Sequence, residues 1–196
     1  MFTVSSGFMG DFKLGDNINH NLEILALLYR QQASSGYHDS RLLCKPITLT
    51  IASICEAILS DFHMRMGTYT NEGVKNVAES VLSYVRGKKI DEFEKYIASA
   101  RKHDLLESKD KSFYDSLDTL RKLRNRIHIQ NSKKHFEADE FQAFSPARQT
   151  NAEKALEKVA KTMADRYVRD ETKTGFVADF QFPWTEHFSS TGKAST

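Results

Sequence analysis

Apolar residues recur every three or four positions along most of the chain, and hardly any segment alternates apolar with polar residues. A spacing near 3.6 residues is typical of amphipathic α-helices, whereas strict alternation is typical of half-buried strands. The pattern predicts five to six helices, at about residues 17–35, 41–66, 71–86, 91–105, 112–130 and 146–170. We therefore expect an all-α fold, a helical bundle in which the first two helices form a long antiparallel pair.

Residues that favour caps and turns mark the ends of these helices. Asp16 or Asn17 is expected to cap the first helix. Pro46 falls near the first turn of the second helix, where its missing N–H is tolerated. Ser112 is expected to cap the fifth helix, with Asp115 three residues later in the manner of a capping box.

The helical pattern delimits one domain. It covers residues 17–170, between an N-terminal segment, residues 1–16, and a C-terminal tail, residues 171–196. The tail contains an aromatic cluster, FVADFQFPW, which we expect to dock on the bundle as an extended segment, and it ends in SSTGKAST, which is expected to fray. A chain of 196 residues can bury one sizeable core, so its length does not require a second domain.

Composition excludes several classes of protein. Hydrophobic residues make up 40% of the chain and charged residues 28%, so it is neither disordered nor collagen-like. The net charge is only +2, so attraction to nucleic acid requires a local cluster of basic residues.

The cysteine spacing and the lack of a predicted targeting segment indicate the cellular compartment of the protein. Cys44 and Cys55 lie eleven residues apart in a helical segment, which is too far for a disulfide, so we expect buried thiols in a reducing compartment. The chain does not begin with a basic segment followed by an apolar core, and no apolar run approaches about 18 residues. We therefore expect a cytoplasmic protein without membrane association.

One stretch of the predicted fifth helix, LRKLRNRIHIQN at residues 120–131, concentrates basic and polar side chains. At about 100° per residue, Arg121, Arg124, Asn125 and His128 fall on one face, because the first three precede the histidine by seven, four and three residues. This polar stripe lies about 100° from the centre of the apolar stripe of the same helix, which is formed by Phe113, Leu117, Leu120, Leu123 and Ile127. It is therefore predicted at the rim of helix packing, where a pocket or a subunit contact is expected.

The residue types of this stripe suit phosphate chemistry. Two guanidinium groups on one face repel each other unless an anion lies between them, and a phosphate can satisfy both. A histidine to act as base on a 2′-OH, a cation for the charge on the phosphate oxygens and an amide to hold the strand are what RNA cleavage requires. The competing interpretation is a solvated basic face in which His128 pairs with Glu56 or Asp61 of the second helix.

An arginine followed after four to six residues by a histidine, late in an all-helical domain, resembles the HEPN (higher eukaryotes and prokaryotes nucleotide-binding) superfamily. Many of its members are metal-independent ribonucleases of toxin–antitoxin and antiphage defence systems. Arg121 and His128 have that spacing, but Lys122 stands where the family usually has a polar residue such as asparagine. Arg124 is followed by Asn125, yet only three residues separate it from His128. The sequence leaves open which arginine has the family role.

The resemblance implies a role for each residue of the motif. His128 would be the general base, Arg121 and Arg124 would neutralise the scissile phosphate, and Asn125 would position it. Glu56, on the second helix, would face the motif and either orient His128 or hold an arginine. The resemblance also implies a homodimer whose motif helices face each other across a shared cleft, products with 2′,3′-cyclic phosphate and 5′-OH ends, and no metal or other cofactor.

Other interpretations of the basic residues stay open. Lys133 and Lys134, just past the motif, are candidate RNA-binding residues, although a solvated loop is the more ordinary interpretation. The alternative function is a catalytically inactive HEPN-like module that binds a partner protein, a nucleotide or nucleic acid. An antitoxin or another partner protein could also regulate the chain.

Overall fold

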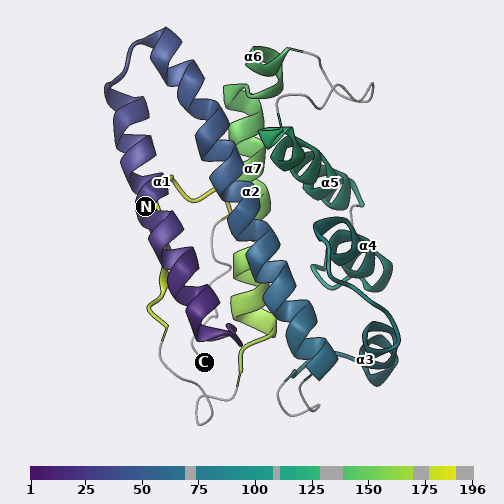
Figure 1. Ribbon diagram of the computed structural model, residues 1–196. Helices are drawn as coiled ribbons and strands as arrows, with labels where there is room; N and C mark the ends of the chain where they lie inside the picture. Colours follow the sequence, from purple (N-terminus) through teal and green to yellow (C-terminus); the bar gives the residue numbers. More distant parts are fainter. Residues whose placement is uncertain (69–73, 108–110, 129–138, 170–176, 189–196) are drawn as a thin grey trace.

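The central element of the fold is one long helix, α2 (Tyr37–Thr68), against which most of the other helices pack (Figure 1). The computed structural model describes residues 1–68, 74–107, 111–128, 139–169 and 177–188. Within them the other elements are β1 (Phe2–Val4), α1 (Phe12–Ser34), α3 (Glu79–Arg86), α4 (Phe93–His103), α5 (Ser112–Arg124), α6 (Glu140–Ala143), α7 (Pro146–Arg166) and β2 (Phe180–Phe182). The fold is an all-α helical bundle, as the sequence predicts.

α1 and α2 form the expected antiparallel pair, and α7 packs along α2 (Figure 1). α3, α4 and α5 contact another side of α2, one above the other. The buried side chains of α2 include Ile47, Ile51, Ile54, Ile58 and Phe62. Because full burial of each such side chain stabilises the fold by about 1.5–3 kcal/mol, α2 organises the core.

By length and average composition α2 could also cross a membrane, a property that the buried central helix of a bundle shares. Its two cysteines, Cys44 and Cys55, are buried and unpaired, as predicted. Burial raises the pKa of both thiols, so neither has the character of a reactive thiolate.

The two ends of the described chain meet in a small antiparallel sheet. β1 pairs with β2, with Phe2 opposite Phe182 and Val4 opposite Phe180. The rings of Phe2 and Phe182 stack with their centroids 5.0 Å apart, and Trp184 packs edge-on against both. The aromatic cluster of the tail therefore docks as an extended segment, as expected. The strand at the N-terminus is not predicted, because three residues are too few to show alternation.

α1 begins earlier than predicted. Its cap is Asp11, whose carboxylate accepts a hydrogen bond of 3.0 Å from the N–H of Leu14. Asp16 and Asn17 lie inside the helix, so the prediction that one of them is the cap is wrong. Asp11 is fixed in the cap position because its own N–H donates a hydrogen bond of 2.8 Å to the buried carboxylate of Asp61.

Other helix ends also differ from the prediction. α5 begins at Ser112 with Lys111 in the cap position, so the prediction that Ser112 is the cap of a capping box is wrong, and Asp115 pairs with Arg101 of α4 at 2.7 Å. α2 begins at Tyr37, so Pro46 lies inside the helix rather than in its first turn. The described part holds seven helices, because the four-residue α6 lies in a polar segment that suggested a loop.

α2 carries a buried ion pair that ties both ends of the chain to it. The side chains of Asp61 and Arg65 are fully buried, with Arg65 Nε 3.2 Å from Asp61 Oδ2. Asp61 also accepts the N–H groups of Gly10 and Asp11, at 3.0 and 2.8 Å, and Arg65 Nη1 donates to the carbonyl oxygen of Tyr167 at 3.2 Å. A Cβ at Gly10 would lie 2.6 Å from Arg65 Cδ, so only glycine fits there.

His63 is a second buried polar residue of α2. It is 3% exposed, its Nδ1 is 2.7 Å from the carbonyl oxygen of Leu59, and its ring packs against Phe62 and Tyr96. Burial lowers the pKa of His63 to about 4, so the ring is neutral in the folded protein at neutral pH.

This burial predicts a loss of stability in acid. Because the unfolded chain protonates His63 at about pH 6.5, before the folded chain does, the free energy of unfolding should fall by about 3 kcal/mol between about pH 6.5 and 4. His63→Phe keeps an aromatic ring at this position and removes the proton-binding site. Urea titrations at both pH values should therefore show a smaller pH-dependent loss in the variant, and an identical loss in both proteins would contradict the prediction.

Candidate active site

α5 is held in the bundle by the predicted apolar stripe. Leu117, Leu120 and Leu123 are almost fully buried between α2 and α7, and Phe113 is partly buried at the start of the helix. Ile127, the last residue of the predicted stripe, is 61% exposed. The stripe therefore ends one turn earlier than its period predicts.

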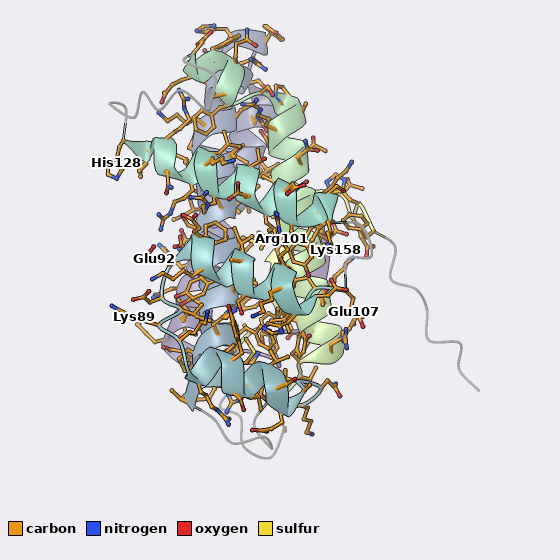
Figure 2. The ribbon with its side chains drawn as sticks, turned by 90° about the vertical axis from the view of Figure 1, so that its right-hand side faces the viewer. Lys89, Glu92, Arg101, Glu107, His128 and Lys158 are labelled. Atoms are coloured by element: carbon orange, nitrogen blue, oxygen red, sulfur yellow. The ribbon has the colours of Figure 1, made fainter. Side chains whose placement is uncertain are left out.

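The motif does not lie on one continuous helix. α5 ends at Arg124, residues Asn125–Ile127 form a 3-10 turn, and His128 follows in extended backbone with φ −84° and ψ 100°. Figure 2 shows His128 at the far end of α5, away from the packed helices. The prediction of a helical stripe that includes His128 is therefore wrong. Within the described residues, no hydrogen bond or ion pair joins His128 to Arg121 or to Arg124.

Arg121 is bound to carboxylates on the side of α5 that faces α4. Its Nε and Nη2 each lie 2.8 Å from Asp118 Oδ1, and its Nη1 lies 3.2 Å from Glu94 Oε2. Lys122 also contacts Asp118, at 2.8 Å. Partial burial raises the pKa of Asp118, but hydrogen bonds from Lys122 and Arg121 outweigh it and hold that pKa below its ordinary value. The side chain of Arg121 is only 17% exposed, so little of it faces solvent.

Arg124 belongs to a different cluster, between the end of α5 and the middle of α2. Its Nη2 lies 2.5 Å from Glu56 Oε2, and its Nη1 donates to Asn125 Oδ1 at 3.2 Å. A hydrogen bond this short between charged groups is among the stronger side-chain contacts in proteins. Glu56 therefore holds an arginine, which is one of the two arrangements expected of it. The side chain of Arg124 is 39% exposed, so the paired guanidinium still faces solvent.

The structure thus separates the two arginines that the sequence placed on one face. Asp118 as a partner of Arg121 could have been found from the sequence, because the two lie three residues apart on one helix. Glu94 has no such signal, since only the packing of α4 on α5 brings it there. Arg126 is also unforeseen: it lies in the 3-10 turn and is 8% exposed, although its position on an ideal helix would point it away from the core.

The structure does not describe the two remaining candidates. Lys133 and Lys134 lie outside the described residues, so their contact with RNA stays a prediction. Among the residues that the structure describes, no group of three or more histidine, cysteine, aspartate or glutamate side chains could hold a metal ion. The site therefore consists of Glu56, Arg124 and Asn125, with His128 beside them in the chain.

Comparisons of the chain with models of protein families, with curated proteins and with solved structures find no match. The function therefore has to be inferred from the chemistry of the cluster at the end of α5, which contains Glu56, Arg124, Asn125 and His128. That cluster offers one partly exposed cation, one amide and one exposed imidazole within five consecutive residues, with a carboxylate from α2 against the cation.

Proposed function

We propose that the protein is a metal-independent endoribonuclease of HEPN type, acting in a toxin–antitoxin or antiphage defence system. The observation that carries the proposal is the contact of Glu56 with Arg124, which stands beside Asn125 and four residues before His128. It supports a site in which a partly exposed guanidinium is held in place, with its charge balanced, until a phosphate arrives. Buried free thiols suit a reducing compartment such as the cytoplasm.

Each residue has a role in cleavage of the RNA backbone. His128 removes the proton of the 2′-OH, whose oxygen attacks the adjacent phosphorus while the bond to the 5′ oxygen of the next nucleotide breaks. Arg124 neutralises the charge on the phosphate oxygens, and Asn125 positions that phosphate. The leaving oxygen takes up a proton, so the products carry 2′,3′-cyclic phosphate and 5′-OH ends.

The two arginine clusters favour Arg124 over Arg121 for the phosphate-binding role. Arg121 is bound by two carboxylates and is mostly buried, whereas Arg124 has one carboxylate partner and is more exposed. Arg124 is also followed by Asn125, the kind of residue that usually follows the arginine in the family that the sequence resembles. Its shorter spacing to His128 is accommodated by the 3-10 turn, which rises about 2 Å per residue compared with 1.5 Å in an α-helix.

A homodimer would complete the site. In the single chain His128 is exposed, and among the described residues nothing orients its ring, although a general base has to be held within hydrogen-bond reach of its proton. Ile127 beside it is 61% exposed, so it is an apolar side chain that a second copy could cover. Two copies that meet at the ends of α5 would cover Ile127 and place two motifs across one cleft.

The test of the proposal compares the two arginines. Purified protein is incubated with single-stranded RNA in EDTA, and the product ends are identified. Arg124→Ala is expected to lower kcat about 10²- to 10³-fold, because the variant lacks the cation that stabilises the transition state. Arg121→Ala, which removes the same charge one turn away, should retain most of the activity.

Three outcomes would contradict the proposal. If the wild-type chain leaves RNA uncut, the protein is not a nuclease. If EDTA abolishes cleavage, the mechanism requires a metal. If Arg124→Ala and Arg121→Ala lose activity equally, Arg124 is not the phosphate-binding arginine.

The second candidate is a catalytically inactive HEPN-like module that binds RNA or a partner protein, such as an antitoxin. It is favoured because no hydrogen bond or ion pair joins His128 to Arg124 among the described residues, and a binding surface does not need the two groups to act on one phosphate. RNA that is bound but left intact by the wild-type protein, at every concentration that saturates binding, would support this candidate.

A further inference from the structure

Two lysines from different parts of the chain converge on one aromatic ring, Tyr84 of α3. Lys102, near the end of α4, places its Nζ 3.8 Å from the ring centroid, and Lys88, which follows α3, places its Nζ 4.7 Å from it. His103 packs edge-on against the same ring, with 4.7 Å between centroids. Tyr84 is half-buried while both lysines are exposed, so the ring fixes two cations at the surface.

Within the described part of the chain, neither of these ammonium groups is neutralised, because no carboxylate there forms an ion pair with Lys88 or Lys102. The neighbouring lysines behave differently, since Lys89 and Lys95 both pair with Asp91, at 3.0 and 2.8 Å. The carboxylates that follow Lys102 in the chain are engaged elsewhere: that of Asp104 accepts from the hydroxyl of Tyr114, and that of Glu107 pairs with Arg166.

The energies are consistent with a site of persistent positive charge. Each cation–π contact is worth about 0.5–1 kcal/mol at an exposed position, and the ring has no net charge with which to cancel that of the lysine. The two nitrogens cannot be farther apart than the sum of their distances to the centroid, which is less than the Debye length of about 10 Å at 0.1 M salt. Their mutual repulsion in water is therefore at least about 0.5 kcal/mol.

The pKa of His103 depends on the charge of Lys102. The pKa of His103 is lowered by burial and, to a smaller degree, by the charge of Lys102. Its Nε2 is buried and has no hydrogen-bond partner within the described residues. An anion that neutralised Lys102 would remove part of the repulsion, so it would raise the pKa of His103.

We propose that Lys88 and Lys102, held on Tyr84, form an anchoring site for the phosphate backbone of single-stranded RNA, separate from the cleavage site. The inference rests on the proposed function, which makes RNA the polyanion to be held. Lysine binds phosphate as a point charge, and such contacts hold a strand without reading its sequence. Figure 2 shows α3, α4 and α5 stacked across the long helices, with Arg101, the neighbour of Lys102, away from His128. A strand anchored here would cross α4 to reach the end of α5.

The test measures RNA binding in full-length chains that all carry His128→Ala, so that the RNA stays intact. Binding of a fluorescent single-stranded RNA of about 16 nucleotides is followed by anisotropy at several salt concentrations. Lys88→Ala/Lys102→Ala is expected to bind about 20-fold more weakly at 0.1 M salt. Its plot of log K against log salt should be shallower by about 1.4, because each phosphate that a lysine no longer neutralises lowers the slope by about 0.7.

Lys89→Ala/Lys95→Ala is the matched control, because it removes the same charge from lysines that already have a carboxylate partner. Its affinity should change less than about 2-fold. NMR titration should also show that RNA raises the pKa of His103 in the chain that keeps Lys102, but not in the Lys88→Ala/Lys102→Ala chain.

Equal losses in the two double variants would overturn the anchoring site, and so would no loss in either, or no RNA binding by any chain. Competition by polyglutamate as effective as that by RNA would reassign the surface to an acidic protein partner. Failure of the proposed function would look different: the wild-type chain would leave RNA uncut, while the two double variants would still differ in affinity.

Discussion

Replacing His128 by alanine is expected to lower the rate of RNA cleavage by about 10²- to 10⁴-fold while the protein stays folded. The large kinetic effect follows from removal of the only proton acceptor that the chain carries within the motif itself. The small structural effect follows from exposure, because His128 lies beyond the 3-10 turn and has no hydrogen bond or ion pair with the described residues. Its free energy of unfolding should change by less than about 0.5 kcal/mol.

His20→Ala is the matched control for this prediction, since His20 is an exposed histidine on α1. Single-turnover cleavage at saturating RNA should separate the chemical step from binding, with RNA affinity nearly unchanged in His128→Ala. Cleavage at the wild-type rate by His128→Ala, or an equal loss in His20→Ala, would exclude His128 as the general base.

Replacing Arg65 by methionine is expected to reduce the free energy of unfolding by about 3–5 kcal/mol. The variant would leave Asp61 as a fully buried carboxylate without its cation, although the N–H groups of Gly10 and Asp11 would still donate to it. It would also lose the hydrogen bond to the carbonyl oxygen of Tyr167. Urea denaturation at neutral pH measures the change.

A double variant shows whether the unpaired charge causes this loss. Asp61→Asn/Arg65→Met removes both charges but keeps a side-chain oxygen for the two N–H groups, so it should be more stable than Arg65→Met by at least about 1 kcal/mol. Arg30→Met, at an exposed position of α1, should change stability by less than about 0.5 kcal/mol. Strictly additive losses in the double variant would contradict this explanation.

The end of α5 shows where sequence reasoning stopped being sufficient. No glycine or proline occurs between residues 112 and 145, so nothing local marks an end to the helix as early as Arg124, and the apolar spacing continues through Ile127. The helix nevertheless stops at Arg124, which is bound to Glu56, and the next turn tightens to a 3-10 turn that buries Arg126. These contacts join residues far apart in the sequence, so no local pattern could contain them.

The sequence by itself determined the order of the long helices and their buried faces, because a period of 3.6 residues sustained over several turns has one physical meaning in a folded chain. It also determined that two arginines, an asparagine and a histidine lie close together, and that Glu56 is available on an earlier helix. It did not determine the start of α3, which lies at Glu79 and not near residue 71 as predicted. Only the tertiary structure decided that Arg121 pairs toward α4 while Arg124 pairs toward α2. The reason is that a charged side chain takes the carboxylate that packing brings within reach, and packing depends on the whole chain.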